Sequence, residues 1–256
     1  MRDLPALAER LMPIVARAGA AIMRVYDGSE VAVQRKEDNS PLTQADLESQ
    51  RVILEGLTES TPDIPILSEE SAHAPWSERR GWRELWVVDP LDGTREFLKR
   101  NGEFTVNIAL VQEHEPVLGI VAAPALGLLY WGALGVGAFS QHRGAGRLPL
   151  KVSAPHSPLR VVGSRSHPSS ETAAYLSGLG PHVLSGIGSS LKFCLIAEGK
   201  ADLYPRFGPT SEWDTAAGQA VLEAAGGRVT RPDGHRLRYN CRETLINGDF
   251  VAVGGS

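Results

Sequence analysis

Apolar residues return at helical spacing in the first part of the chain. Between residues 4 and 26, leucine, isoleucine, valine and alanine recur every three or four positions, which predicts an amphipathic helix with one buried face. Pro13 lies within this segment and would interrupt or kink the helix. A second helix is predicted to begin near Thr43, whose spacing to Asp46 resembles a capping box, and to end at Thr61.

Short apolar runs of strand length follow the two helices. They predict buried strands at 64–67 and 85–88, and then an antiparallel meander at 104–111, 117–122 and 128–134. The first two strands both run directly into acidic residues. The charged stretch between them, residues 71–84, is predicted to be a loop.

The pattern changes near residue 150, where strands and helices begin to alternate. The predicted elements are a strand at 159–163, a helix at 169–178, a strand near 183, a helix at 189–198 and a strand at 201–205. A further helix at 213–225 ends at two glycines. We therefore predict two lobes, an N-terminal α+β lobe of residues 1–150 and a C-terminal α/β lobe of residues 151–256.

Composition and charge exclude several classes of protein. The chain has 26 Lys and Arg residues against 30 Asp and Glu, a net charge of -4, so no overall positive field attracts a nucleic-acid polymer. No stretch approaches the roughly 20 apolar residues of a membrane span. The two cysteines, Cys194 and Cys241, lie far apart, which argues against a disulfide framework or a zinc site and favours a reducing cytoplasm.

The segment LWVVDPLDGT, residues 85–94, delivers two aspartates into a tight turn. Its proline keeps the preceding residue extended and its glycine tolerates unusual dihedrals, so the carboxylates of Asp89 and Asp92 are expected to face one concavity. Carboxylates this close repel each other. Mg²⁺, which prefers oxygen ligands, relieves that repulsion, and the Leu91 carbonyl is expected to join them.

Other acids at strand and helix ends complete a candidate two-metal centre. Glu69 and Glu70 follow the first predicted strand, and Asp214 opens the last predicted helix. If Glu69 and Asp214 converge with the two aspartates of the turn, four charges balance two Mg²⁺ ions that can clamp a phosphate for attack by water. Taken singly, each acid is more typical of a turn or a helix cap, so the prediction depends on the whole set.

Two further residues are candidates for handling the water. Thr94 and Asp46 are expected to orient it, while the amides of Gly93 and Thr94 donate to phosphate oxygens. Two alternatives stay open at this point. Asp46 can be only a helix cap, and Glu70 only a solvated neighbour of the site.

Together these motifs resemble the inositol monophosphatase superfamily of Mg²⁺-dependent, lithium-sensitive phosphatases. The superfamily pattern joins a Glu-Glu pair, an Asp-Pro-Ile/Leu-Asp-Gly-Thr turn and a later Trp-Asp, here Glu69-Glu70, residues 89–94 and Trp213-Asp214. Further segments are similar to CysQ-type 3′(2′),5′-bisphosphate nucleotidases within that superfamily, at residues 102–111, 163–167, 188–210 and 213–218. The resemblance covers nearly the whole chain, and it implies a fold of the α+β or α/β class, a layered α-β-α-β-α sandwich.

The resemblance also implies roles for particular residues. Glu69, Asp89 and the Leu91 carbonyl would hold the first Mg²⁺, and Asp89, Asp92 and Asp214 the second. Catalytic roles would fall to Asp46, Glu69 and Thr94. The residues that would touch substrate are Leu91, Asp92, Gly93, Thr94, His167, Ser189, Lys192, Arg206 and Asp214. From the residues alone, Lys192 can equally lie on a solvated helix face, and His167 can be a loop residue with no ligand.

The implied reaction is hydrolysis of 3′-phosphoadenosine 5′-phosphate to AMP and phosphate by direct attack of water, a clearance step linked to sulfate assimilation. Whether the sulfate-donor nucleotide is also cleaved at its 3′-phosphate stays open. An inositol monophosphatase or sugar bisphosphatase would need the same acids but not Ser189, Lys192 and Arg206. A non-catalytic nucleotide or metal sensor could lose Asp46 and Thr94, yet both are present.

The expected partner is therefore a small bisphosphonucleoside rather than a nucleic-acid polymer. The sequence leaves open whether the protein is a monomer or a dimer. It favours the cytoplasm, with a peripheral position on the inner face of the membrane left as an alternative.

Overall fold

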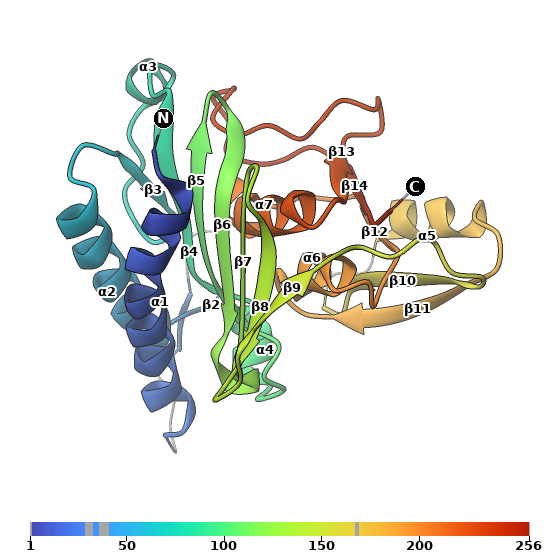
Figure 1. Ribbon diagram of the computed structural model, residues 1–256, viewed down its shortest axis with the longest axis horizontal. Coiled ribbons are helices and arrows are strands. Elements are labelled where there is room, and N and C mark those ends of the chain that lie inside the picture. The colour runs from blue at the N-terminus through green and yellow to red at the C-terminus, as the bar shows by residue number, and fades with distance from the viewer. Residues whose placement is uncertain (1, 29–32, 36–40, 167–168, 256) are drawn as a thin grey trace.

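The computed structural model describes residues 2–28, 33–35, 41–166 and 169–255. Its helices and sheets form successive layers (Figure 1). Helices α1 (Leu4–Tyr26) and α2 (Gln44–Ser60) cover the outer face of a seven-stranded sheet. Between this sheet and a five-stranded sheet lie α6 (Leu191–Ala197) and α7 (Ala216–Ala224), and α5 (Ser170–Ser177) lies beyond the second sheet. The predicted α-β-α-β-α sandwich is confirmed.

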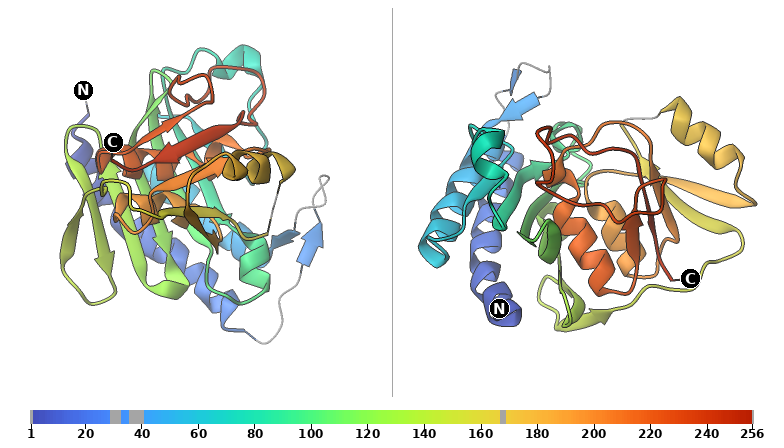
Figure 2. Two further views of the ribbon diagram at one scale, coloured as in Figure 1. Left: turned by 90° about the vertical axis from the view of Figure 1, so that its right-hand side faces the viewer. Right: turned by 90° about the horizontal axis from the view of Figure 1, so that it is seen from above.

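The two N-terminal helices form where the hydrophobic pattern predicts them. Helix α1 runs uninterrupted through Pro13, which is exposed, while its inner face is buried. Thr43 caps α2, and Asp46 completes the capping box, as the spacing of these residues predicts. The two helices pack against each other and against the seven-stranded sheet (Figure 2).

Strands of the first sheet follow one another in sequence order. Its members are β3 (Ile66–Ser68), β4 (Glu84–Asp92), β5 (Thr105–Gln112), β6 (Glu115–Ala123), β7 (Leu128–Ala133), β8 (Gly137–His142) and β9 (Arg147–Leu150). Strand β3 pairs with β4 in parallel, and every later pair is antiparallel. The predicted meander is confirmed but continues through β8 and β9. Strand β8 is partly buried and mixes small, aromatic and polar residues, and β9 is a short, mostly exposed Arg-Leu-Pro-Leu segment, so neither carries the long apolar run of a core strand.

The second sheet is mixed and has the order β11-β10-β12-β14-β13. Its strands are β10 (Leu159–Ser164), β11 (His182–Ile187), β12 (Leu203–Arg206), β13 (Arg228–Thr230) and β14 (Phe250–Val253). Strand β10 pairs in parallel with both β11 and β12, and β14 joins β12 and β13 in antiparallel fashion. The alternating pattern predicted after residue 150 therefore corresponds to this sheet and its helices.

Short elements complete the fold. They are β1 (Val33–Arg35), β2 (Pro41–Thr43), α3 (Trp76–Arg79), α4 (Thr94–Leu98) and the 3₁₀ turns η1 (Pro124–Leu126) and η2 (Glu212–Asp214). Helix α3 lies inside the segment predicted to be a loop, and its buried Arg79 donates to the Asn240 side chain at 3.0 Å. The helix predicted at 213–225 is divided, because the backbone of Thr215 departs from helical dihedrals between η2 and α7.

Helix α7 packs directly on the backbone of the first sheet. A Cβ atom added at Gly119 of β6 would lie 2.3 Å from the Ala217 carbonyl oxygen, and one at Gly132 of β7 would lie 2.9 Å from the Ala224 Cβ. Glycine is needed here because no side chain fits between strand and helix. This close contact fixes the position of the segment that precedes α7.

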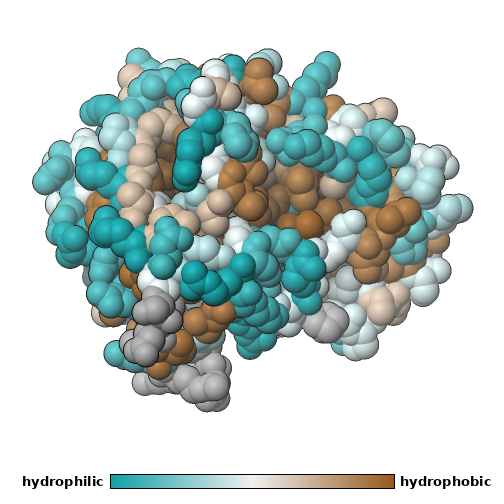
Figure 3. All heavy atoms as spheres, turned by 90° about the horizontal axis from the view of Figure 1, so that it is seen from below, coloured by the Kyte–Doolittle hydropathy of each residue, from teal (hydrophilic) through white to brown (hydrophobic). Residues whose placement is uncertain are grey.

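A single buried cluster includes Val87 and Val121 of the first sheet, Phe250 of the second, and Phe193 of helix α6 between them. The described core is therefore continuous across residue 150, and the division into two lobes stays a prediction. Within the described residues no helix is both long and apolar enough to cross a membrane. On the face shown in Figure 3, hydrophilic side chains predominate, with apolar ones gathered in a central recess and toward the end that carries β10 and β11.

Replacing Gly119 by alanine should lower the free energy of unfolding by about 1 to 3 kcal/mol, because the new methyl group must displace the backbone of α7. Urea unfolding followed by circular dichroism measures this. Gly146→Ala is the matched control, since among the described residues beyond its two chain neighbours no atom lies within 4 Å of the new methyl group, and it should change stability by less than about 0.5 kcal/mol. Equal stability of the two variants would contradict this account of the packing.

Candidate metal and phosphate site

A pairing irregularity in β4 turns two carboxylates toward one side of the sheet. Asp89 pairs with Asn107 and Asp92 with Thr105, so three steps on β4 match two steps on β5. In a regular strand, residues three apart point to opposite faces, whereas the extra residue at a bulge restores the same side. The turn is fixed by a hydrogen bond of 3.0 Å from the Leu91 amide to Asp89 Oδ1.

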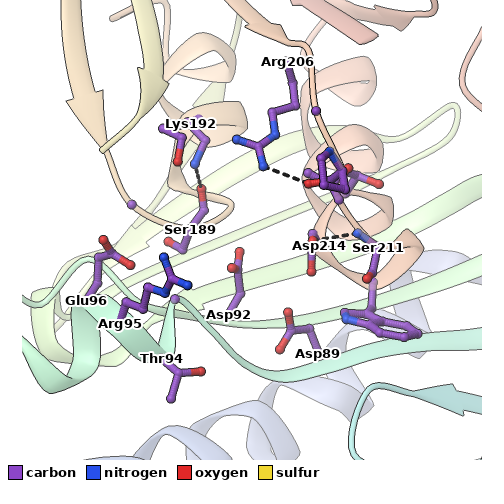
Figure 4. A pocket seen from close by; sticks show the side chains of 18 of the residues that line it. Asp89, Asp92, Thr94, Arg95, Glu96, Ser189, Lys192, Arg206, Ser211 and Asp214 are labelled. Atoms are coloured by element: carbon purple, nitrogen blue, oxygen red, sulfur yellow. Dashed lines mark hydrogen bonds between the residues drawn. The ribbon is translucent and has the colours of Figure 1, made fainter. Parts of the chain in front are cut away.

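Three aspartates meet at the end of this strand (Figure 4). Asp89, Asp92 and Asp214 each offer a carboxylate oxygen, and these oxygens lie within 4.8 Å of one another. Asp214 comes from η2, where its Oδ2 accepts a hydrogen bond of 2.8 Å from the Ser211 amide. Residues far apart in the sequence are thus brought together, as the motif analysis predicts for these three.

The carboxylates of this cluster repel one another, and a bound cation would relieve that repulsion. Burial, with the nearby charges of Glu69, Asp92 and Asp214, raises the pKa of Asp89 well above its ordinary value. Burial and the charges of Asp92 and Glu69 do the same to the pKa of Asp214. A hard divalent cation matches such a set of oxygen donors and removes their mutual repulsion. The chemistry of the donor set therefore fits a magnesium-type ion.

Glu69 and Glu70 occupy different positions. Glu69 lines the cavity together with Asp89, and its charge contributes to the raised pKa of Asp89. Glu70 is half-buried and is not among the described residues that line the cavity. The geometry thus separates the two glutamates, and only Glu69 faces the aspartates.

Asp46 is both a helix cap and a neighbour of Thr94. Its Oδ2 accepts hydrogen bonds from the Thr43 amide at 2.8 Å and the Thr43 hydroxyl at 2.6 Å, which is the capping box of α2. Its Oδ1 lies 3.4 Å from Thr94 Oγ1, at the start of α4. Asp46 therefore caps α2 but is not only a cap, because it also faces Thr94, and the role of this pair in orienting water stays a prediction.

Ser190 and Asn107 support the aspartates and were not predicted from the sequence. The Ser190 hydroxyl lies 2.9 Å from Asp92 Oδ2 and 2.7 Å from the Asp214 carbonyl oxygen, so its one proton can be donated to either. Asn107 Nδ2 donates to Ser190 Oγ at 2.9 Å. Both residues are buried. The role of these two residues becomes visible only in the structure, where they meet. The one signal in the sequence is that Ser190 directly follows Ser189, which was predicted to bind substrate.

A cavity of about 460 Å³ connects the acids to basic and aromatic side chains. Among the substrate-binding residues predicted from the sequence, it is lined by Leu91, Asp92, Gly93, Thr94, Ser189, Lys192, Arg206 and Asp214. The remaining predicted residue, His167, lies outside the described residues. Tyr204, Phe207 and Trp213 add aromatic surface to the wall, and Arg95 and Glu96 add charge.

Lys192 does not lie on a solvated helix face, so that alternative is wrong. Its Nζ donates to the Ser189 carbonyl at 2.6 Å and the Ile187 carbonyl at 3.3 Å, and it lies 5.1 Å from the centre of the Tyr204 ring. Burial lowers the pKa of this ammonium to about 8, against the opposing effect of the Asp92 charge. Ser189 itself has a left-handed backbone, with φ of 49°.

Comparison with known families supports the same assignment of the fold. Residues 3–253 match the model of the inositol monophosphatase family. The chain is 52% identical over 245 residues to the 3′(2′),5′-bisphosphate nucleotidase CysQ of Salmonella typhimurium, covering 95% of this chain and 98% of the relative. It is 49% identical to the CysQ of Escherichia coli K12, with the same coverage.

The fold also superposes on solved structures of the same family. The crystal structure of CysQ from Bacteroides thetaiotaomicron superposes with a TM-score of 0.87 at 40% identity, and the alignment covers 98% of each chain. An inositol monophosphatase from Anabaena superposes with a TM-score of 0.78 at 28% identity, over 100% of this chain and 93% of that one.

Replacing Ser190 by alanine should weaken metal binding about 10-fold, because Asp92 and the backbone of Asp214 lose the hydroxyl that links them. Calorimetric titration of the protein with Mg²⁺ measures this without any substrate. Ser189→Ala is the control, since Ser189 lines the cavity without contacting the aspartates in the described hydrogen bonds, and its metal affinity should stay within about two-fold. Unchanged affinity in Ser190→Ala would count against the linking role.

Proposed function

Because the chain belongs to the inositol monophosphatase family, we propose that it is a metal-dependent 3′(2′),5′-bisphosphate nucleotidase, the activity named for its CysQ relatives. It hydrolyses 3′-phosphoadenosine 5′-phosphate to AMP and phosphate. One observation carries this proposal. The three clustered aspartates and the buried ammonium of Lys192 line one cavity, so a metal-bound phosphate and a second anion can be held together.

The metal is Mg²⁺ in this proposal, since hard carboxylate and carbonyl oxygens are the ligands it prefers. Glu69, Asp89 and the Leu91 carbonyl hold one ion, and Asp89, Asp92 and Asp214 hold a second. When bound, magnesium supplies Lewis acidity and neutralises charge on the phosphate.

The other groups position water and phosphate. Thr94 Oγ1, with Asp46 behind it, directs a water molecule toward the phosphorus and accepts or passes on its proton. The amides of Gly93 and Thr94 donate to phosphate oxygens. Water attacks directly, the bond from phosphorus to the 3′-oxygen breaks, and that oxygen leaves with a proton to give AMP.

Substrate choice depends on the basic side of the cavity. Ser189, Lys192 and Arg206 line the wall next to the acids, and a guanidinium beside an ammonium suits a phosphate that is bound but not cleaved. His167, from the separate motif at residues 163–167, is proposed to join them. An inositol monophosphate or a sugar bisphosphate is the competing substrate, and the sulfate-donor nucleotide is a related one with the same 3′-phosphate.

The cellular setting is also a proposal. Cys194 and Cys241 are both free thiols, Cys194 buried and Cys241 exposed, as suits a reducing compartment. We place the enzyme in the cytoplasm, in the nucleotide clearance that accompanies sulfate assimilation, as a monomer or a dimer. Lithium inhibition is expected from the family.

The purified protein should release phosphate from 3′-phosphoadenosine 5′-phosphate only when Mg²⁺ is present. Asp92→Asn should lower the rate at least about 100-fold, because it removes a charge and an oxygen from the cluster. Asp233→Asn, at an exposed ion pair with Arg231, is the control and should keep full activity. Turnover in the presence of a chelator, or in Asp92→Asn, would contradict the mechanism, and faster turnover of inositol 1-phosphate would favour the competing substrate.

Lys192→Met should raise KM for the bisphosphate about 10-fold or more and leave KM for adenosine 3′-monophosphate nearly unchanged, since only the former carries a second phosphate. The ammonium is charged below its pKa of about 8, so kcat/KM for the bisphosphate should fall as the pH rises through that value. The fall should be absent in Lys192→Met.

The control for this series is Lys200→Met, an exposed lysine that pairs with Glu198 and does not line the cavity among the described residues, which should reproduce the wild-type profile. Equal losses on both substrates in Lys192→Met would remove the lysine from substrate selection.

A further inference from the structure

Arg95 follows the Asp-Pro-Leu-Asp-Gly-Thr turn directly and lines the cavity. It lies in α4, whose other side is anchored by Glu96 and Phe97, only 4% and 1% exposed. The Arg95 side chain itself is exposed. In Figure 4 its guanidinium extends from α4 toward Ser189, on the side of Asp92 that is away from Asp89.

The basic residues of the cavity differ in how they are already engaged. Lys192 Nζ donates to the Ser189 carbonyl at 2.6 Å, and Arg206 Nη2 donates to the Pro209 carbonyl at 2.8 Å. For Arg95, the part of the chain that the structure describes supplies neither a hydrogen-bond acceptor nor an ion-pair partner. Its planar set of N–H donors therefore faces the cavity without a protein acceptor in that part of the chain.

The turn that carries Arg95 lies against the loop that carries Ser189. A Cβ atom added at Gly93, whose φ is 90°, would be 3.4 Å from the Ser189 Cβ and 3.2 Å from the Glu103 carbonyl oxygen. Glu103 also holds the loop, because its Oε2 accepts the Gly188 amide at 2.8 Å. Arg95 and Lys192 therefore approach the same part of the cavity from two elements held together by backbone contacts.

The position of Arg95 decides which phosphate it can serve. The phosphate that is transferred belongs at the aspartate cluster, where Asp89 and Asp214 meet Asp92. Arg95 lies beyond Asp92 from Asp89, next to Ser189 (Figure 4). A guanidinium offers two parallel N–H groups that match two oxygens of one phosphate, which a single ammonium cannot do.

We propose that Arg95 binds the phosphate that is not transferred, and that it is a specificity-determining residue for bisphosphorylated substrates. The inference rests on the proposed function, in that it assumes a substrate with two phosphates. Arg95 grips two oxygens of the second phosphate from the α4 side, while Lys192 supplies a charge from the α6 side. Substrates that carry only the transferred phosphate, such as adenosine 3′-monophosphate, bind without this contact.

Steady-state kinetics of full-length Arg95→Ala and Arg95→Lys with Mg²⁺ test the proposal on two substrates. Arg95→Ala should raise KM for 3′-phosphoadenosine 5′-phosphate about 10-fold to 100-fold, which is the loss of affinity expected when charge-assisted hydrogen bonds to a phosphate are removed. It should raise KM for adenosine 3′-monophosphate less than about two-fold. Arg95→Lys keeps the charge but loses the paired N–H donors, so its KM for the bisphosphate should lie between those of wild type and Arg95→Ala. Lys99→Ala, an exposed residue of the same segment that is not among the described residues lining the cavity, is the charge-matched control and should match wild type.

Calorimetric binding of AMP, which carries only the 5′-phosphate, gives a readout that needs no turnover. Arg95→Ala should weaken AMP binding by the same factor as the rise in KM, and the binding of inorganic phosphate should not change. Equal losses on both substrates, or weaker binding of inorganic phosphate, would assign Arg95 to the transferred phosphate and overturn the proposal, as would unchanged AMP binding. If the wild-type protein leaves the bisphosphate intact, the proposed function fails, and the AMP titration still decides whether Arg95 binds a 5′-phosphate.

Discussion

Repulsion among buried carboxylates is the constraint around which this structure is organised. Carboxylate oxygens of the buried Asp89 and the half-buried Asp92 and Asp214 lie within 4.8 Å of one another, and Glu69 adds a further charge. Hydrogen bonds hold each acid in place: the Leu91 amide donates to Asp89, the Ser211 amide to Asp214, and the Ser190 hydroxyl lies 2.9 Å from Asp92 Oδ2. The folded chain therefore presents a preformed set of ligands to a divalent cation.

Much of the fold could be predicted from the sequence because its signals are local. The apolar periodicity of α1, the capping box of Thr43 and Asp46, and the apolar runs of β5 to β7 each act over a few residues. Strands β8 and β9 could not be predicted because neither has a long apolar run, and both depend on backbone pairing with a neighbouring strand. The lone turn of helix at α3 is likewise held by distant contacts of Arg79, which no local pattern contains.

The residues of the site also divide into those that the sequence predicts and those that only the folded structure brings together. A short motif sets the spacing of Asp89 and Asp92, whereas Asp214 could be joined to them only as a hypothesis, from its position at a predicted helix start and then from the family pattern. Ser190 and Asn107 meet from segments 83 residues apart, so their contact is invisible in the sequence. For Lys192, the helical position was predicted but the burial was not, because it depends on how β12 and its Tyr204 cover the helix.

The contact between α7 and the glycines of β6 and β7 also limits how the protein can move. Asp214 immediately precedes this helix, and the helix touches the backbone of the sheet from which Asp89 and Asp92 project. To separate the acids, α7 would have to move away from the first sheet. At Gly119 and Gly132 the helix packs directly on the strand backbone, so this movement would break close contacts. This packing therefore opposes any movement that would pull Asp214 away from the two aspartates of the sheet.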